Sequence, residues 1–418
     1  MESESALERI LRRGAAAPAQ EYDGDQLDLE ERESLRRVIG LSTELEDITD
    51  VEYRQLRIEK VILIGVWSQG NLTAAENSLR ELSALAETAG AKVLDGLLQR
   101  RNMPDPTSYL GKGKAAELRD LARSLGADTV IANTELSPSQ RRSLEDIVKI
   151  KVIDRTAIIL DIFAQHAKSK EGKAQVELAQ LEYLLPRLRG WGDSMSRQAG
   201  GQAAGGVGIG SRGPGETKIE LDRRRINTRM AKLRREIKGM KLARDTKRQS
   251  RQKSRVPQVA IAGYTNAGKS SLLNRLTKAG VLVENALFAT LDPTVRKHST
   301  PDGREYTISD TVGFVRDLPH QLVEAFRSTL EEIAGADLIV HVVDATDPDP
   351  LGQISTVRSV IADFDASSIA ELVVFNKADL VSDEVQVRLR GMVQGALLVS
   401  ARTGQGIDAL QEAIAGML

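Results

Sequence analysis

Apolar residues from about residue 60 onward form short runs that alternate with amphipathic stretches. The run Val61–Val66 is almost continuously apolar, as expected of a strand buried on both faces. The pattern that follows predicts helices over Thr73–Ala89, Lys114–Leu125 and Pro138–Val148, and strands over Lys92–Leu98, Thr129–Ala132 and Lys151–Ile153. This alternation of strands and helices favours a small parallel α/β domain.

A helical period replaces this alternation over residues 168–254. One helix face is formed by Leu178, Leu181, Leu185 and Leu188, which recur at intervals of three and four. A four-three spacing, typical of a coiled-coil seam, relates Ile219, Ile226, Met230, Leu233, Ile237 and Met240. We expect two long antiparallel helices, a helical hairpin. The loop between them, 190–215, contains too many glycines for a packed core.

A phosphate-binding motif opens the next segment. It reads Gly-Tyr-Thr-Asn-Ala-Gly-Lys-Ser directly after the apolar run Val259–Ala262, which is the pattern of a P-loop between a strand and a helix. Backbone N–H groups of such a loop surround phosphates, a lysine adds positive charge, and the serine hydroxyl is a ligand for Mg²⁺. The candidate residues are Gly263, Tyr264, Thr265, Asn266, Ala267, Gly268, Lys269 and Ser270.

A second motif indicates which base the site holds. Asn376, Lys377, Ala378 and Asp379 follow the apolar strand 372–375. The Asp379 carboxylate can accept hydrogen bonds from guanine N1–H and the exocyclic amine, while Asn376 can reach the O6/N7 edge. Adenine lacks this pair of donors, so the motif selects GTP over ATP. A backbone N–H near O6 is expected from the later stretch Ser400, Ala401 and Arg402.

Two candidate switch segments lie between these motifs. Asp310, Thr311, Val312 and Gly313 follow a predicted strand around Tyr306 and Ile308. Asp310 can hold Mg²⁺ through a water, and the Gly313 N–H can meet the γ-phosphate. The upstream segment contains Phe288, Ala289, Thr290, Leu291 and Asp292, followed by Pro293 and Thr294. We interpret Thr294 as a helix or turn cap after the proline.

The residue after Gly313 is unusual for a GTPase. Ras-type enzymes use a glutamine there to orient the attacking water, whereas this chain has Phe314. No catalytic side chain is therefore assigned. Asn266 has two interpretations: related potassium-dependent GTPases use an asparagine at this place to hold a monovalent cation, but asparagine also suits the left-handed conformation of turns. The P-loop serine makes Mg²⁺ the expected cofactor, and Asn266 makes K⁺ a second candidate.

Composition narrows the class of protein. The chain has 418 residues, which predicts more than one domain, and it has no cysteine, which excludes disulfides and thiolate zinc sites. Its four histidines form no metal-binding pattern, and no apolar run approaches eighteen residues. We expect a monomeric cytoplasmic protein without a signal peptide or membrane span.

A near-neutral net charge of −1 hides a strongly basic helix. Between Arg223 and Arg255 there are fifteen lysines and arginines against two acidic residues. A charge run is often only a solvated helix face, but this excess lies beside a flexible loop that carries Arg197 and Arg212. We therefore favour a nucleic-acid partner, most simply RNA, contacted by Arg197, Arg212, Arg234, Arg235 and Lys238.

Several longer segments resemble the HflX family of GTPases, within the Obg–HflX superfamily. They are Asp105–Lys114, Asp161–Ser169, Glu177–Leu181, Leu184–Leu188 and Gly208–Thr217. With the GTPase motifs, the resemblance covers about residues 58–418. It implies a factor that binds GTP and GDP, contacts rRNA of the large (50S) ribosomal subunit, and dissociates or rescues stalled 70S ribosomes under stress. It also implies Thr290 as the second Mg²⁺ ligand and a glycine loop that reaches the peptidyl-transferase region.

The expected fold is α/β in four parts. They are an acidic N-terminal extension (1–57), a parallel α/β domain (58–167), a helical hairpin (168–254), and a Ras-like P-loop GTPase domain with a mixed, mostly parallel sheet (255–418). Stretch 199–206 resembles an insertion, and the chain ends one helix after Ser400. Two other functions stay open: a ribosome-assembly GTPase acting on maturing rRNA, and an ATP-driven RNA remodeller using the N-terminal domain.

Overall fold

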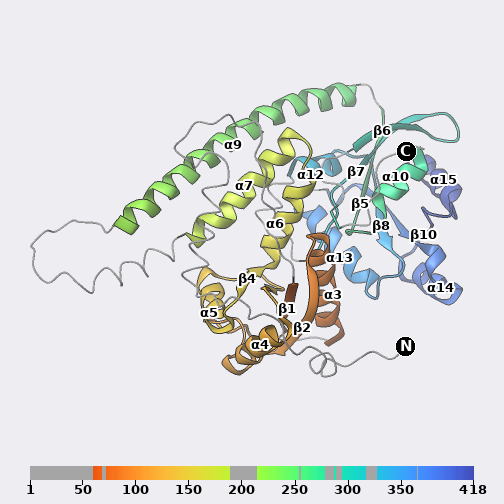
Figure 1. The fold of residues 1–418 in the computed structure, drawn as a ribbon. Helices are drawn as coiled ribbons and strands as arrows, with labels where there is room; N and C mark the ends of the chain where they lie inside the picture. Colours follow the sequence, from red (N-terminus) through yellow and green to blue (C-terminus); the bar gives the residue numbers. More distant parts are fainter. Residues whose placement is uncertain are drawn as a thin grey trace, which may run out of the picture. The chain divides into compact units, whose positions relative to one another are not determined.

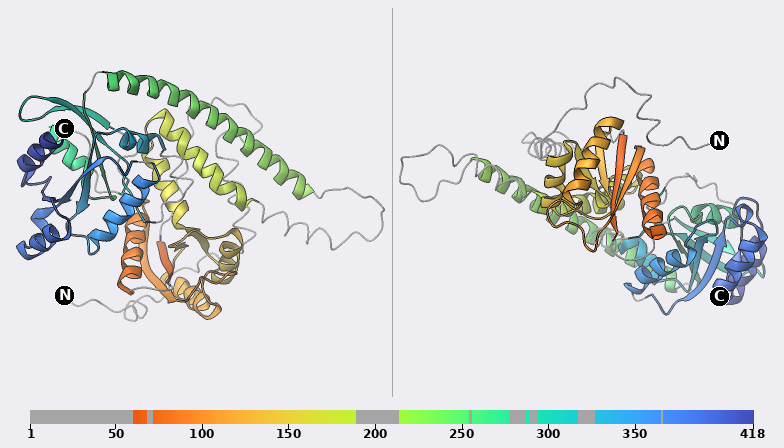
Figure 2. Two further views of the ribbon diagram at one scale, coloured as in Figure 1. Left: turned by 180° about the vertical axis from the view of Figure 1, so that it is seen from behind. Right: turned by 90° about the horizontal axis from the view of Figure 1, so that it is seen from below.

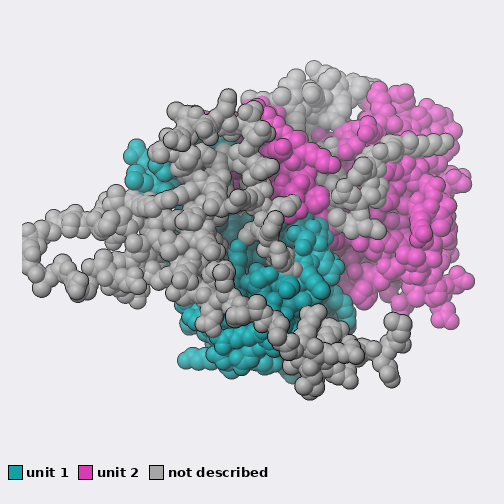
Figure 3. Space-filling view, viewed as in Figure 1, with its two compact units in different colours: residues 1–162, 180–232 teal, residues 163–179, 233–418 magenta. Residues whose placement is uncertain are grey.

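The computed structural model describes residues 60–67, 72–188, 214–253, 256–277, 287–288, 294–316, 327–364 and 366–418. The chain divides into two compact units. The first unit contains Met1–Ile162 and Gln180–Lys232, and the second contains Phe163–Ala179 and Leu233–Leu418 (Figure 3). The predicted N-terminal extension lies outside the described residues.

The first unit is built on a four-stranded parallel sheet with the order β2-β1-β3-β4 (Figure 1). Its strands are β1 (Lys60–Trp67), β2 (Lys92–Arg100), β3 (Thr129–Ala132) and β4 (Lys151–Asp154), connected by α3 (Leu72–Thr88), α4 (Lys112–Leu125) and α5 (Pro138–Val148). Residues 61–64 of the central strand are at most 2% exposed, which explains their unbroken apolar run. The predicted parallel α/β fold is confirmed.

Helix α6 (Arg155–His166) has no counterpart among the predicted elements. Its apolar side chains Ile158, Ile159, Leu160, Ile162 and Phe163 are all at most 3% exposed. A helix that is apolar around most of its circumference lacks the polar stripe from which an amphipathic helix is recognised. Burial on several sides therefore hid this helix from a periodicity argument.

The predicted helical hairpin is formed by α7 (Lys170–Arg187) and α9 (Pro214–Lys253). The two helices lie side by side in Figure 1 and in both views of Figure 2. Ile226, Met230 and Leu233 of the predicted seam are buried. On α7, however, the most buried side chains include Ala174, Val176, Ala179, Tyr183 and Arg187 as well as Leu181, so the predicted leucine face is only part of the contact surface.

The second unit contains a six-stranded sheet with the order β10-β9-β8-β5-β7-β6. Its strands are β5 (Gln258–Gly263), β6 (Thr294–Ser299), β7 (Glu305–Asp310), β8 (Leu338–Asp344), β9 (Ala370–Asn376) and β10 (Leu397–Leu398). All neighbouring pairs are parallel except β6 and β7, which confirms a mixed, mostly parallel sheet. Thr294 pairs with Asp310 as the first residue of β6. Its interpretation as a cap is therefore wrong, because the chain is already extended there.

Helices cover both faces of this sheet. On one face, α10 (Lys269–Thr277) and α15 (Ile407–Met417) share a core with alternate strand residues such as Val259, Ile261 and Val340. The opposite face, which includes Val343 and Phe375, packs against α13 (Pro350–Ala362) and α14 (Asp383–Met392). Helix α12 (Arg327–Ala334) and the 3₁₀ turn η2 (Ala378–Leu380) complete the described elements. This arrangement brings the carboxyl ends of β5, β7, β8 and β9 to one edge, where the sequence motifs lie.

Candidate functional site

The P-loop follows β5 without a break. Gly263 has φ +152°, and a Cβ built there would lie 2.1 Å from the carbonyl oxygen of Val342. Gly268 has φ +89°, and a Cβ there would lie 2.3 Å from the side-chain nitrogen of Asn376. Side chains are therefore excluded at both glycines of the motif, by backbone conformation as well as by space. Helix α10 begins at Lys269, so its N-terminal N–H groups face the concave side of the turn.

Lys269 is held in position by the loop itself. Its side chain is 6% exposed, and its Nζ donates a hydrogen bond to the Tyr264 carbonyl oxygen at 2.9 Å. Burial lowers the pKa of Lys269 to about 8, and the nearby Asp310 carboxylate opposes that change. An ammonium group with this little solvent is poised to bind an anion that replaces its lost hydration.

Two side-chain oxygen groups, of Ser270 and Asp310, lie beside this lysine. The Ser270 hydroxyl donates to the Asp310 carboxylate at 2.6 Å, which joins the start of α10 to the end of β7. Hard oxygen donors at the end of a phosphate-binding loop suit Mg²⁺, which keeps several waters and uses few protein ligands. The two residues therefore fit the expected cation. Thr290, the other expected ligand, lies outside the described residues, as do Ala289, Leu291 and Asp292.

The segment after Asp310 runs along the P-loop. Thr311 is buried and donates from its hydroxyl to the Ile261 carbonyl oxygen at 2.7 Å, and Val312 is also buried. At Gly313, a Cβ would lie 2.6 Å from Thr265 Cγ2 and 3.1 Å from Lys269 Nζ. Only glycine fits between the loop and its lysine. The next residue, Phe314, is 1% exposed and exchanges backbone hydrogen bonds with Gly263 and Thr265, at 3.1 and 2.8 Å.

Asn376 forms hydrogen bonds that connect the P-loop with the two segments predicted to recognise the base, 376–379 and 400–402. Its side-chain nitrogen donates to the Ala267 carbonyl oxygen at 2.8 Å, and its side-chain oxygen accepts from the Ala401 N–H at 3.0 Å. On α10, Arg275 donates to the carbonyl oxygens of Ala401, at 2.9 Å, and of Arg402. Ser400 is fully buried beside them. Residues more than a hundred positions apart in sequence thus form one site.

Lys377 and Asp379 occupy the turn after β9. Lys377 has φ +65° and forms an ion pair with Asp344 at 2.6 Å, which fixes the turn. The next residue, Ala378, is buried and donates from its backbone N–H to the Val399 carbonyl oxygen at 3.0 Å. Asp379 is exposed at the start of η2, available to a ligand. Its assignment as the base-reading carboxylate stays a prediction.

Phe288 is the first residue of the predicted upstream switch segment, 288–292, and the structure describes it. It is 2% exposed and has φ +59°, a conformation that is strained for a bulky side chain. Its ring packs edge-on against Phe163, with ring centroids 4.5 Å apart, in the same unit. Phe163 is thus a neighbour of the switch that local sequence patterns do not reveal, because 125 residues separate the two rings.

The basic helix α9 presents the predicted charged residues to solvent. Arg234, Arg235 and Lys238 are exposed, while Met230 and Leu233 on the same helix are buried. The other two expected RNA-contacting residues, Arg197 and Arg212, lie outside the described residues.

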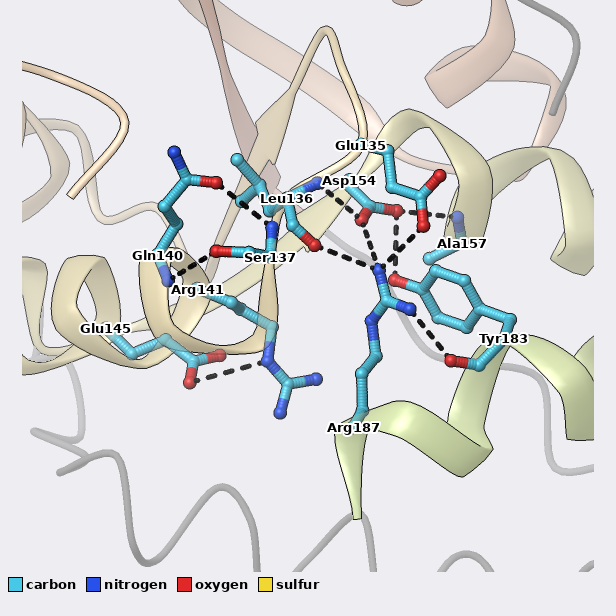
Figure 4. A network of polar contacts seen from close by, with 10 residues as sticks. All are labelled: Glu135, Leu136, Ser137, Gln140, Arg141, Glu145, Asp154, Ala157, Tyr183 and Arg187. Atoms are coloured by element: carbon cyan, nitrogen blue, oxygen red, sulfur yellow. Dashed lines mark hydrogen bonds and ion pairs between the residues drawn. The ribbon is translucent and has the colours of Figure 1, made fainter. Parts of the chain in front are cut away.

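A buried polar network in the first unit was not anticipated (Figure 4). Asp154, at the end of β4, accepts hydrogen bonds from Tyr183 Oη at 2.9 Å and from Arg187 at 3.1 Å. Arg187 also donates to the Leu136 carbonyl oxygen at 3.1 Å and stacks on the Tyr183 ring, 3.4 Å from its centroid. The network fixes the end of α7 to the sheet, directly before the glycine-rich segment. These three hydrogen bonds join residues that are 29 to 51 positions apart, beyond any local motif.

Within the described residues, no group of three or more His, Asp or Glu side chains could hold a metal ion. Over the same part of the chain, no helix is both long and apolar enough to cross a bilayer.

Models of known protein families match three consecutive segments of the chain. Residues 76–164 match the family model "GTP-binding GTPase N-terminal", residues 166–251 match "GTP-binding GTPase Middle Region", and residues 258–377 match "50S ribosome-binding GTPase".

Among curated proteins, "GTPase HflX" of Caldanaerobacter subterraneus subsp. tengcongensis is 48% identical over 356 residues, which cover 85% of this chain and 80% of the relative. "GTPase HflX" of Escherichia coli K12 is 44% identical over 339 residues, with 80% and 78% covered. A solved structure, the complex of SsGBP with GDP, is 25% identical with a TM-score of 0.46, and covers 86% of this chain and 98% of that one.

Proposed function

Because the chain belongs to the HflX family of GTPases, we propose that it binds the large ribosomal subunit and dissociates or rescues stalled 70S ribosomes under stress. Hydrolysis of GTP to GDP and phosphate follows from the family. The proposal is carried by the joint geometry of the P-loop, the Ser270–Asp310 pair and the hydrogen bonds of Asn376, together with the exposed basic residues of α9. We propose that the protein acts in the cytoplasm as a monomer, with the four-part domain division predicted above.

In this proposal each motif has one task. The P-loop residues 263–270 surround the phosphates, with Lys269 as the positive charge. Ser270, and Thr290 from the upstream switch 288–292, would hold Mg²⁺, which supplies charge neutralisation on the β- and γ-phosphates when bound. The segment 310–313 meets the γ-phosphate, 376–379 read guanine, and 400–402 close over the base. Arg197, Arg212, Arg234, Arg235 and Lys238 contact rRNA.

The test of the proposed function is subunit separation. Purified mature 70S ribosomes are mixed with the protein and a non-hydrolysable GTP analogue, and light scattering is followed. We expect scattering to fall with the analogue and not with GDP, because GTP favours the ribosome-bound state. Sedimentation with isolated large subunits in each nucleotide state is the matched binding measurement. Binding to immature particles with no separation of mature ribosomes would favour the alternative of an assembly factor.

An ATP-driven remodeller is the other alternative. Nucleotide competition on a truncated protein that lacks residues 257–418 tests it directly. Binding of ATP by that fragment, coupled to RNA unwinding, would support this alternative.

The monovalent cation is a separate prediction of this proposal. Asn266 is exposed and has φ +58°, so turn chemistry alone can account for it. If its side chain also holds a cation, phosphate release by the wild type should be faster in K⁺ than in Na⁺. Asn266→Gly retains the backbone conformation and removes the amide, and should lose the difference. Equal rates for the wild type in the two salts would refute the potassium role.

We also expect slow intrinsic turnover that large subunits raise, because Phe314 cannot hydrogen-bond the attacking water. Phosphate release at full rate without ribosomes would contradict this expectation.

A further inference from the structure

The absence of a water-orienting side chain after Gly313 raises a physical question about the switch segment 313–316. Without that side chain, the position of the switch backbone becomes more important for orienting the water, and other groups must fix this position. A displacement of about 1 Å in such a site can cost about a hundredfold in rate. The groups that hold this segment therefore matter for the reaction.

The P-loop holds the segment from one side. Phe314 forms backbone hydrogen bonds with Gly263 and Thr265, which make a short parallel bridge between Tyr264 and Phe314. The side chains of Phe314 and Val315 are buried. Two residues later, the Arg316 N–H donates to the Tyr264 hydroxyl at 2.6 Å. Tyr264 is 4% exposed, and a buried tyrosine hydroxyl needs a polar partner. Here that partner is a backbone N–H group of the switch.

Helix α13 holds it from the other side. The Arg316 guanidinium forms an ion pair with Asp349 at 2.6 Å. The other carboxylate oxygen of Asp349 accepts from the Gly352 N–H at 3.0 Å and caps α13. A Cβ at Gly352 would lie 2.1 Å from that carboxylate, so the glycine leaves room for the cap. Asp349 is therefore anchored before it meets Arg316.

We propose that Tyr264 and the Arg316–Asp349 pair are positioning residues for GTP hydrolysis, which together clamp the switch segment so that Gly313 stays beside Lys269. The inference rests on the GTP site proposed above. A purely stabilising role is the competing explanation. The ion pair is 25% exposed at Arg316 and 43% exposed at Asp349, and pairs this open to solvent add little to stability. Their loss should therefore affect turnover more than folding.

The substitutions can be nearly isosteric. Tyr264→Phe removes only the hydroxyl, and Asp349→Asn keeps a good helix cap while weakening the ion pair. Arg316→Lys keeps the charge, and Arg316→Met removes it. Tyr306→Phe is the matched control, because Tyr306 is a buried tyrosine of β7 whose ring packs on His298. Among the described residues, no hydrogen bond, ion pair or ring contact joins Tyr306 to the P-loop or to the switch segment 313–316. The full-length protein is used throughout.

We expect Tyr264→Phe to lower kcat by about tenfold, with KM and the Kd for GTP within about twofold of the wild type. Asp349→Asn and Arg316→Met should lower kcat in the same way, and Arg316→Lys should recover most of it. The double variant Tyr264→Phe/Asp349→Asn should lose less than the product of the single losses, because both act on one segment. Melting temperatures should change no more than that of Tyr306→Phe.

Wild-type kcat in Tyr264→Phe would overturn the clamp, as would a loss of kcat matched by Tyr306→Phe or explained by a lower melting temperature. If the wild type itself bound no GTP, the proposed site would fail and the clamp with it. Normal wild-type binding and hydrolysis with no effect of the variants would refute the clamp alone.

Discussion

Lys269 illustrates at the residue scale how burial tunes a binding group. Its ammonium lies among protein groups with one hydrogen bond, to the Tyr264 carbonyl oxygen, and burial lowers its pKa to about 8. A bound triphosphate requires the charged form. Above pH 8, most of the nucleotide-free protein has lost the Lys269 proton. Binding of the triphosphate must then take up a proton, so the affinity becomes weaker as the pH rises.

The predicted effect is a fall in GTP affinity of about fourfold between pH 7 and pH 8.5, from the fraction of lysine still protonated. Nucleotide titration at a series of pH values measures it. Lys269→Met should bind weakly at every pH and show no such step. Between pH 8 and 10.5, Lys269 is largely deprotonated in the native state and largely protonated in the unfolded chain. The free energy of unfolding of the nucleotide-free protein should therefore increase as the pH rises through this range. A flat affinity profile would contradict the assigned role.

Asp379 gives a second prediction at the residue scale. Its exposed carboxylate follows the fixed turn at Lys377, and Asp379→Asn should weaken GTP and improve xanthosine triphosphate, because xanthine has an oxygen in place of the exocyclic amine. A charge-assisted hydrogen bond contributes about 1.5–3 kcal/mol, so the shift should be about tenfold or more. Asp383→Asn, an exposed acid four residues later, is the control for a general charge effect. Unchanged GTP affinity in Asp379→Asn would remove it as the base reader.

At the scale of elements, α9 combines two surfaces on one helix. Ile226, Met230 and Leu233 are buried, and Arg234, Arg235 and Lys238, which follow them on the same helix, are exposed. The apolar positions anchor the helix within the protein, and the charged positions face solvent. This division is what a helix needs in order to present a basic face without unfolding.

Replacing Arg234, Arg235 and Lys238 by Glu should weaken binding to large subunits and flatten its salt dependence, because each phosphate contact contributes about one to the slope against log salt concentration. GTP affinity should stay unchanged. Pelleting with large subunits at several salt concentrations measures the slope. The same charge change at Lys92, Arg119 and Arg123 of the first unit is the control. An equal loss in both triple variants would indicate a non-specific charge effect.

At the scale of the whole molecule, both helices of the hairpin are divided between the two units. The part of α7 up to Ala179 and the part of α9 from Leu233 onward belong to the second unit, which contains the GTP motifs. The rest of both helices belongs to the first unit. The Asp154–Tyr183–Arg187 network fixes the end of α7 to the first unit's sheet, directly before the glycine-rich segment. We expect the proposed binding and the proposed separation of ribosomes to depend on different parts of the chain.

Deleting Gly200–Gly210 should separate these two activities. A glycine segment contributes little electrostatic affinity, so most binding to large subunits should remain, whereas separation of 70S ribosomes should be lost. Pelleting, light scattering and nucleotide binding in one preparation measure the three properties together. Normal separation by the deletion variant would make the segment a connector and place the splitting activity in the hairpin or the GTPase unit.

Much of the fold and of the candidate site follows from local sequence. Strand β3 and helix α5 have their predicted bounds, and the P-loop lies between a strand and a helix as expected. Helix α6 could not be predicted because it is buried on several sides, and the cap assigned to Thr294 failed because β6 starts there. Strand pairing outweighed the turn preference of the preceding proline.

The sequence by itself determined the groups whose chemistry depends on short spacing: the glycines and Lys269 of the P-loop, the Asp310–Gly313 segment, the Asn376–Asp379 motif and the charge of α9. These features act through backbone geometry within a few residues, which a sequence states directly. Only the tertiary structure decided which distant groups join them. Asn376 meets Ala267 across 109 positions, Arg316 meets Tyr264 across 52, and Arg187 meets Asp154 across 33. The first two pairs exist because parallel strands bring their carboxyl ends to one edge, and the third because α7 packs its end against the end of β4. These are effects of sheet order and helix packing that no local pattern encodes.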